Sequence, residues 1–192
     1  MTEGLAGEIE TRGFAVIPGH LDRQTLHDTR EWHEASLAAA DPAAVSLSAS
    51  GSNTRVHLTR NHRGLDHLHL DPLLLALGAH VLGGPVRLGA FLSRTVHPGA
   101  AAQGLHSDCP GDGGRPGMLG FIYALDDFRV DNGATRFLPG SHSGLTQGAC
   151  VPATAPAGSL IVYDGAVHHG FSANTSRDDR RSIEGSLVPV RP

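Results

Sequence analysis

"VRLGAFLSRTV" (Val86–Val96) is the longest of five short runs, rich in β-branched or aromatic residues, that follow one another through the second half of the chain. The other runs are GMLGFIYAL (Gly117–Leu125), ATRFL (Ala134–Leu138), GSLIVYDG (Gly158–Gly165) and SIEGSLVPV (Ser182–Val190). Turn residues such as Pro98-Gly99 and Pro139-Gly140 separate them. Regularly spaced short strands with such corners are typical of an antiparallel sandwich or barrel, not of a parallel sheet. We therefore predict a β core over about residues 85–192.

The first half of the chain mixes helices with short strands. Leu5 and Ile9 share one face of a helix that Gly13 can end, and FAVI (Phe14–Ile17) has the pattern of a buried strand. Further along we expect a helix from the N-cap Asp22 to about Ala40, stopped by Asp41-Pro42. A mobile loop over 44–53 and a strand over 54–59 should follow it. A second helix is expected over 73–82, between the N-cap Asp71 and Gly83-Gly84. We predict one domain over 1–192, with helical support over about 1–84.

Charge and composition limit the class of partner. The chain has 192 residues and a net charge of -4, so it lacks the basic surface of a nucleic-acid or anionic-membrane binder. Glu3 stands where a secretory signal would carry a basic residue, and the apolar run Leu73–Leu82 is too short to span a bilayer. Cys109 and Cys150 show neither a disulfide framework nor a zinc spacing. We expect a cytoplasmic protein that acts on a small molecule.

The main chemical signal is His106-Ser107-Asp108, where a long strand meets a glycine-rich loop. In extended chain, residues two apart project to the same face, so one imidazole and one carboxylate can reach the same ion. His169 follows the run SLIVYDG, and a rolled antiparallel sheet can bring it alongside. Two histidines and one carboxylate on a triangular face leave three positions open, as in oxygen-activating ferrous enzymes, whereas zinc enzymes usually leave one. A second His-x-Asp, at His69-Leu70-Asp71, is better explained by Asp71 capping a helix.

Arg180 lies eleven residues after His169. A dicarboxylate that chelates iron through its keto-acid end needs an anchor for its far carboxylate, and a guanidinium on a neighbouring strand provides two parallel hydrogen bonds. Ser182 faces the same way and can add a hydroxyl. A solvated charged turn is the simpler explanation of the RDDRR stretch on its own, but the metal triad reverses that preference.

Four stretches resemble the phytanoyl-CoA dioxygenase family, and together they cover most of the chain. They are GFAVIPGHLD near the start, LHSD, ALDDFRVDNGATRFLPGSH, and GSLIVYDGAVHHGFSANTSRDDRRSI. The resemblance implies a mainly β fold with flanking helices, built on a double-stranded β-helix (jelly-roll, cupin-like). It also implies that iron(II), 2-oxoglutarate and O2 are used, and that succinate and CO2 are released.

The resemblance also assigns residues. It gives His169 as the distal ligand, with Asn174 and Arg180 in family positions; with His168 instead, the residue eleven positions later would be Asp179, which repels a carboxylate. Family members commonly have a small hydroxyl residue where this chain has Phe171. The chain is also shorter than is usual for the family, which implies trimmed loops over the substrate.

Asp108 bears on the type of reaction. Halogenating relatives have Gly or Ala at that position, so the carboxylate implies hydroxylation, or desaturation, epoxidation or ring formation.

Further contacts are assigned from strand alternation. Ser93 and Thr95 share one face of the strand before His106, and Tyr123 shares a face with Phe121 on the next strand. Either pair could face the pocket or pack in the core; we assign Ser93, Thr95 and Tyr123 to 2-oxoglutarate. For the substrate we assign Arg136, Phe171 and His97.

The sequence leaves three kinds of function to separate. We expect an oxygenase that oxidises a small organic molecule, such as a natural-product intermediate. The first alternative is a cupin-like metal enzyme without 2-oxoglutarate, which would give Arg180 no role. The second is a catalytically silent barrel that only binds a ligand, which would need neither intact metal ligands nor the arginine.

Overall fold

The structure is a computed structural model that describes residues 2–40, 45–47, 53–58, 63–109 and 116–190. Its helices are α1 (Thr2–Arg12), α2 (Arg23–Ala38), α3 (Asp66–His69) and α4 (Pro72–Leu82), with 3-10 turns η2 (Arg63–Leu65) and η3 (Ser141–Ser143). Its strands are β1 (Phe14–Ile17), β2 (Val45–Leu47), β3 (Asn53–His57), β4 (Val86–Val96), β5 (Leu119–Ala124), β6 (Thr135–Phe137), β7 (Val151–Pro152), β8 (Leu160–Asp164), β9 (His169–Phe171) and β10 (Arg180–Pro189).

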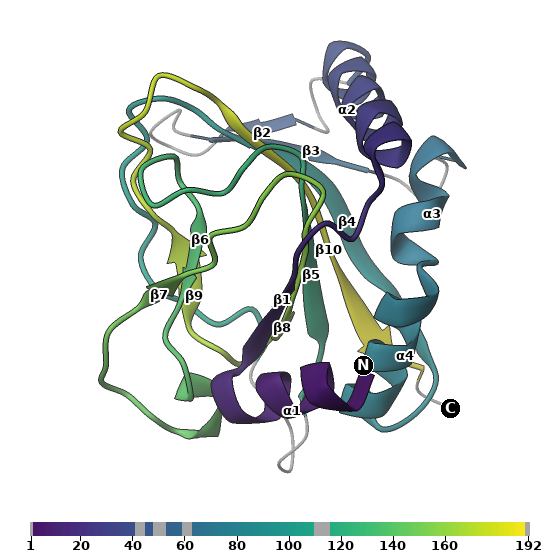
Figure 1. Cartoon of the computed structure of the whole chain (residues 1–192), viewed down its shortest axis with the longest axis vertical. Coiled ribbons are helices and arrows are strands. Elements are labelled where there is room, and N and C mark those ends of the chain that lie inside the picture. Colours follow the sequence, from purple (N-terminus) through teal and green to yellow (C-terminus); the bar gives the residue numbers. More distant parts are fainter. Residues whose placement is uncertain (1, 41–44, 48–52, 59–62, 110–115, 191–192) are drawn as a thin grey trace.

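The strands form two sheets. A seven-stranded sheet has the order β1-β8-β5-β10-β4-β3-β2, and a three-stranded sheet has the order β7-β6-β9. Every strand pair described is antiparallel. Figure 1 shows the small sheet on one side of the large sheet and helices α3 and α4 on the other. The predicted antiparallel β core with flanking helices is confirmed.

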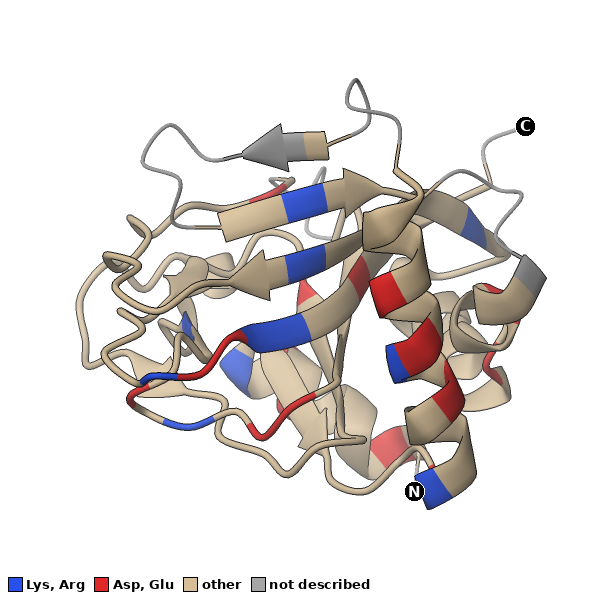
Figure 2. Ribbon diagram, turned by 90° about the horizontal axis from the view of Figure 1, so that it is seen from above, with Lys and Arg blue, Asp and Glu red and all other residues tan. Residues whose placement is uncertain are grey.

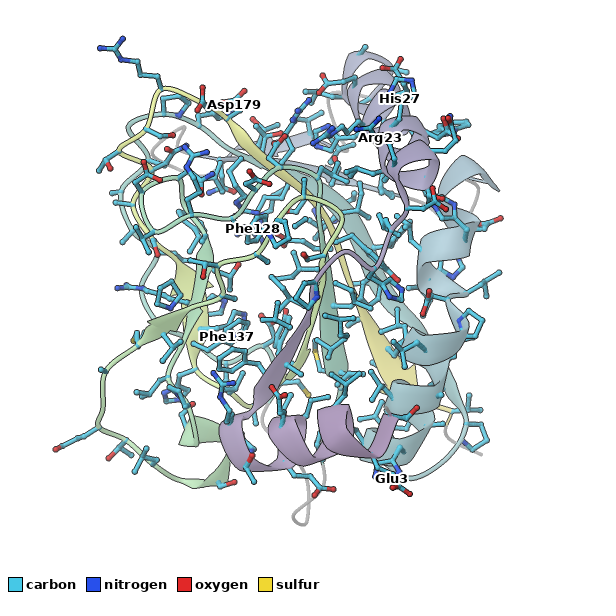
Figure 3. The ribbon with its side chains drawn as sticks, in the orientation of Figure 1. Glu3, Arg23, His27, Phe128, Phe137 and Asp179 are labelled. Atoms are coloured by element: carbon cyan, nitrogen blue, oxygen red, sulfur yellow. The ribbon has the colours of Figure 1, made fainter. Side chains whose placement is uncertain are left out.

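Strand alternation divides the interior into two apolar layers. On β5, Phe121 and Tyr123 point towards the helices and pack with Leu74 and Leu77 of α4 and their neighbours. Ile122, between them, points the other way, into a cluster that includes Phe128 and Phe137, both labelled in Figure 3. The second layer fills the space between the two sheets. Residues of the large sheet with the parity of Ile122 therefore face the small sheet.

The predicted helix boundaries agree with the structure. Asp22 caps α2, because its Oδ1 accepts from the backbone N–H of Thr25 at 2.8 Å, and Asp71 caps α4 in the same way through Leu74 at 2.8 Å. Gly13 and Gly83 follow α1 and α4 with φ of 86° and 75°, a conformation that glycine adopts without steric cost. In the part of the chain described, no helix is long and apolar enough to cross a membrane.

One prediction for the first half is wrong in part. The stretch 44–53 was expected to be a loop, but Val45–Leu47 forms β2 and pairs antiparallel with β3. Pairing with β3, and not the sequence of these three residues by itself, holds the stretch in an extended conformation. The predicted Asp41-Pro42 stop, the rest of the loop apart from Asn53, and the end of the strand at Thr59 lie outside the described residues.

Asn174 fixes the turn that leads into β10. Its buried Nδ2 donates to the carbonyls of Val96 at 3.0 Å and Asp178 at 2.8 Å, and its Oδ1 accepts from Ser176. Asn174→Ala leaves these carbonyls without their donor, so we expect the free energy of unfolding to fall by about 2–3 kcal/mol in denaturant titrations. The neighbouring exposed Thr175→Ala should change it by less than about 0.5 kcal/mol. Equal effects of the two substitutions would contradict this role.

Candidate metal centre

An antiparallel bridge brings His106 and His169 together. The backbone N–H of His106 donates to the carbonyl of His169 at 3.0 Å, and the reverse bond is 2.9 Å. Asp108 is fixed to the turn after β8, since its N–H donates to the carbonyl of Gly165 at 2.9 Å. The segment before β5 therefore runs beside β9, which explains how residues 63 positions apart meet at one point.

The side chains of His106, Asp108 and His169 converge. One ligand atom from each lies within 4.8 Å of the others. Nε2 of His106 is 3.5 Å from Oδ1 of Asp108, and Nε2 of His169 is 3.4 Å from Oδ2. This spacing suits three donors that surround one face of a cation.

Hydrogen bonds set which imidazole nitrogens are free. Nδ1 of His106 lies 3.2 Å from the carbonyl of Gly104, and Nδ1 of His169 lies 2.9 Å from the carbonyl of Val167. Because a carbonyl can only accept, Nδ1 of each ring carries a proton, and Nε2 is the nitrogen that faces Asp108. Nε2 can donate to that carboxylate when it is protonated, or offer its lone pair to a metal when it is not. Such bonds orient histidine ligands in metal sites.

The carboxylate of Asp108 is held in its charged form. Burial alone would raise its pKa, but hydrogen bonds from His106, His169 and Tyr163 hold the pKa of Asp108 well below its usual range. The hydrogen bond to Asp108 in turn raises the pKa of His106. The triad thus offers the negative charge that a divalent ion requires.

The triad is covered on one side and open on the other. The side chain of His169 is 8% exposed and packs on the rings of Tyr163 and Phe137, whereas His106 is 39% exposed and Asp108 32%. Small molecules can therefore approach from the side of His106 and Asp108.

Tyr163 holds the carboxylate of Asp108 from within the core. Its hydroxyl donates to Oδ2 of Asp108 at 2.8 Å. Gly120, directly opposite on β5, makes room for the ring, because a Cβ there would lie 2.1 Å from Cζ of Tyr163. Burial raises the pKa of Tyr163 well above its usual value, so the hydroxyl remains a donor.

Tyr163→Phe is expected to weaken iron(II) binding about tenfold to a hundredfold, as loss of a bond to a metal-bound carboxylate does elsewhere. Anaerobic titration with iron(II) measures the effect. Tyr123→Phe is the matched control, because the Tyr123 hydroxyl donates to the carbonyl of Leu68 on the far face of the sheet. Equal iron affinities in the two variants would contradict the role of Tyr163.

Arg180 lies beside the triad with part of its guanidinium unpaired. The side chain is fully buried at the start of β10, over the ring of Phe128 at 4.5 Å. Its Nη1 donates to Oγ of Ser182 at 2.8 Å, while Nε and Nη2 are buried with no hydrogen-bond partner among the described residues. Burial lowers the pKa of Arg180 to about 10, so it remains charged at neutral pH. Nε and Nη2 form one edge of the fork, which matches a carboxylate.

A small pocket between the sheets joins these groups. Its volume is about 50 Å³. Of the residues assigned from sequence, it is lined by His106, Asp108, His169, Arg180 and Phe171, and Ser182 contacts it through Arg180. Thr135 also lines the pocket, and the sequence assignment missed the remaining polar lining residues Arg94, Gln103, Tyr163 and Glu184.

Ser93, Thr95 and Tyr123 are on the wrong face to be co-substrate contacts. Ile183 of β10 pairs with both Tyr123 and Ser93, and directly paired residues point to the same face. Ile183 and Tyr123 belong to the helix-side apolar layer, so Ser93 and Thr95 face the helices as well. The assumed parity of β4 was off by one residue, and Arg94 is the residue that faces the pocket.

Arg136 and His97 also lie away from the pocket. Thr135 lines it, so alternation turns Arg136 to the outer face of the small sheet, where Nη2 donates to the carbonyl of Gln103 at 3.1 Å. Both ring nitrogens of His97 are engaged, one with Thr54 at 2.7 Å and the other with Asp179, labelled in Figure 3, at 3.0 Å. Neither side chain lines this pocket, so the assignment of Arg136 and His97 to the substrate stays a prediction.

The fold and these side chains define an antiparallel two-sheet barrel with a His/Asp/His triad and a buried arginine at its centre. The sequence profile of the family described as Phytanoyl-CoA dioxygenase (PhyH) matches residues 9–182. The chain belongs to this family.

Relatives and solved structures agree with this membership. The chain is 26% identical over 199 residues to Dioxygenase af480 of Aspergillus fumigatus, covering 94% of this chain and 64% of that protein. Dioxygenase aneA of Aspergillus aculeatus is 36% identical over 104 residues, which are 45% of this chain and 34% of that protein. The chain thus spans less than two thirds of these relatives.

Two solved structures have the same fold. The epimerase SnoN from nogalamycin biosynthesis superposes with a TM-score of 0.85 at 22% identity, over 97% of this chain and 82% of that one. AviO1 from Streptomyces viridochromogenes Tue57 superposes with a TM-score of 0.81 at 22% identity, over 100% of this chain and 98% of that one. The predicted jelly-roll fold is confirmed.

Proposed function

We propose that this protein is an iron(II)- and 2-oxoglutarate-dependent oxygenase that oxidises a small organic molecule. The observation that carries the proposal is the pairing of the triad with Arg180, whose Nε and Nη2 are buried without a partner in the described part of the chain. Buried donors are costly to leave unpaired, so these two atoms indicate a binding position for an anion.

The side chains of the site fit both iron(II) and 2-oxoglutarate. His106, Asp108 and His169 supply two imidazoles and one carboxylate, the set found in non-haem ferrous oxygenases, and they would hold the iron. Arg180 would hold the far carboxylate of 2-oxoglutarate, with Ser182 orienting its guanidinium. When bound, iron(II), 2-oxoglutarate and O2 supply the oxidising power, and succinate and CO2 are released.

The chain's own residues bind, orient and exclude water. Tyr163 fixes one oxygen of Asp108, so the carboxylate keeps a single orientation. Phe171, which is 5% exposed, stands where family members commonly have a small hydroxyl residue. It makes that wall of the pocket apolar. The open side by His106 is the approach for the substrate. In a hydroxylation, one oxygen atom of O2 enters the substrate and the other enters succinate.

Natural-product intermediates are the substrate class that we propose. SnoN is described as an alpha ketoglutarate dependent epimerase from nogalamycin biosynthesis, and a second SnoN structure is described as a complex with Fe3+, alpha ketoglutarate and nogalamycin RO. Likeness of fold alone does not establish a substrate, so this substrate class is a proposal that a screen of such compounds tests.

Succinate release tests the proposal. The purified protein, loaded anaerobically with iron(II), is given 2-oxoglutarate, O2 and a library of natural-product scaffolds. We expect iron-dependent succinate formation that increases with a productive substrate. Substrate loss without succinate would favour the cupin-like alternative, and binding of a ligand with no 2-oxoglutarate-dependent change at the metal would favour a silent barrel.

A further inference from the structure

We propose that Arg94 is a second binding residue for the far carboxylate of the keto diacid, and that Glu184 holds Arg94 and Arg180 in place for it. The proposal rests on the proposed function. It concerns residues that face the pocket on two neighbouring strands of the large sheet.

A continuous polar chain links the two arginines. Nε of Arg94 donates to Oε2 of Glu184 at 2.7 Å, and Oγ of Ser182 donates to Oε1 of Glu184 at 2.8 Å. Ser182 in turn accepts from Nη1 of Arg180 at 2.8 Å, and this Nη1 is 3.6 Å from Oε1 of Glu184. Glu184 therefore contacts both cations, and each guanidinium keeps donors directed elsewhere.

Strand register places the whole group on one face. Arg94 of β4 lies directly opposite Ser182 of β10, and Arg180 and Glu184 are two residues before and after Ser182. Figure 2 shows basic positions side by side on β3, β4 and β10, next to an acidic position on β10. The three charged side chains therefore line the same pocket as the triad.

Unpaired donors occur on both arginines. Nη1 of Arg94 is buried without a partner in the described structure, as are Nε and Nη2 of Arg180. The side chain of Arg94 is only 13% exposed, so water does not readily replace a missing acceptor. Three such donor nitrogens around one pocket are unusual in a native protein. A ligand that supplies acceptor oxygens explains all three.

The charges identify the ligand as an anion. Arg94 and Arg180 carry two positive charges, and Glu184 carries one negative charge, which both guanidiniums help to keep ionised. Asp108 in the same pocket is also negative, but in the proposed function its carboxylate is a metal ligand, so among Arg94, Arg180 and Glu184 one positive charge is left for a further anion. A single carboxylate would neutralise it, as the far end of a keto diacid does.

The test compares two keto acids that differ only in that carboxylate. Anaerobic iron(II)-loaded protein is titrated with 2-oxoglutarate and with 2-oxopentanoate, and binding is followed by calorimetry and by the visible absorption of the chelate. We expect Arg94→Gln to weaken 2-oxoglutarate binding about tenfold to a hundredfold and to leave 2-oxopentanoate binding unchanged. Arg87→Gln, an exposed position on the same strand, is the control and should change neither.

A double substitution separates direct contact from simple neutralisation. Arg94→Gln alone leaves Glu184 without its partner, whereas Arg94→Gln with Glu184→Gln replaces the ion pair by two neutral amides. If Arg94 contacts the carboxylate, the double variant still binds 2-oxoglutarate weakly; recovery of wild-type affinity would overturn the proposal. Arg94→Lys provides the test if the glutamine variants fold poorly. It keeps the charge beside Glu184 but lacks the guanidinium fork, so it should also bind 2-oxoglutarate weakly. Unchanged affinity in Arg94→Lys would likewise overturn it.

The failure of the proposed function has a different signature. If the wild-type protein shows no iron-dependent binding of 2-oxoglutarate, the oxygenase assignment itself is wrong. If the wild type binds 2-oxoglutarate and every Arg94 variant binds it equally well, only the role of Arg94 is wrong.

Discussion

His169→Ala and Asp108→Ala are each expected to abolish iron-dependent succinate formation. Each substitution removes one of three donors to the ion, and the loss should exceed the roughly tenfold to hundredfold effect of changing a residue that only supports a ligand. Iron(II) affinity, measured anaerobically, should fall with activity. A fall in both succinate formation and iron(II) affinity would show that the metal is lost, whereas a fall in succinate formation alone would show that it is bound in an inactive position.

Two controls are built into the sequence. His168 is adjacent to His169 but does not belong to the convergent triad, so His168→Ala should keep iron affinity within about threefold of the wild type. His69 belongs to the second His-x-Asp, whose aspartate caps α4. His69→Ala should therefore also keep the iron affinity of the wild type. Wild-type succinate formation in Asp108→Ala, or iron loss in His168→Ala, would refute the assignment.

Arg180→Gln is expected to raise the KM for 2-oxoglutarate about a hundredfold or more, because two charge-assisted hydrogen bonds to the far carboxylate are lost. Iron(II) affinity should change little, since no atom of Arg180 belongs to the triad. Arg180→Lys keeps the charge but not the fork, so its KM should also rise. Steady-state succinate formation at several 2-oxoglutarate concentrations measures the effect.

A matched control uses the exposed Arg177, three residues earlier. Arg177→Gln removes one positive charge from the same stretch without touching the pocket, so its KM should equal that of the wild type. Thermal unfolding of each variant shows whether loss of the fully buried Arg180 also destabilises the fold. An unchanged KM in a folded Arg180→Gln would show that the arginine does not hold the co-substrate.

The fold was largely predictable because its signals are local. Capping residues such as Asp22 and Asp71 set helix starts, and glycines at positive φ set helix ends. Short runs between Gly/Pro corners marked the strands of the β core. The short strand β2 was missed, because three residues are stabilised by pairing with β3 and not by their own pattern.

The site was predictable only in part, because strand parity decides which side chains face the pocket. The triad and Arg180 were found through motif spacing, and the structure brings them together. Ser93 and Thr95 were chosen on β4, although the pocket face carries Arg94 between them. The β5 strand is buried on both faces, so hydrophobicity gave no sign that Tyr123 faces the helices.

Some missed residues did leave a signal in the sequence. Glu184 is two residues beyond Ser182 and four beyond Arg180, so alternation along β10 already places it on their face. The hydroxyl of Tyr163 gave no such sign, because its contact with Asp108 depends on β8 lying behind the segment that carries His106.

Anaerobic crystallisation with iron(II) and 2-oxoglutarate, with anomalous scattering to locate the iron, would show both groups in their sites. We expect one iron held by Nε2 of His106, a carboxylate oxygen of Asp108 and Nε2 of His169, with the far carboxylate of 2-oxoglutarate against Nε and Nη2 of Arg180. Iron bound elsewhere, or a keto diacid that avoids Arg180, would contradict this arrangement.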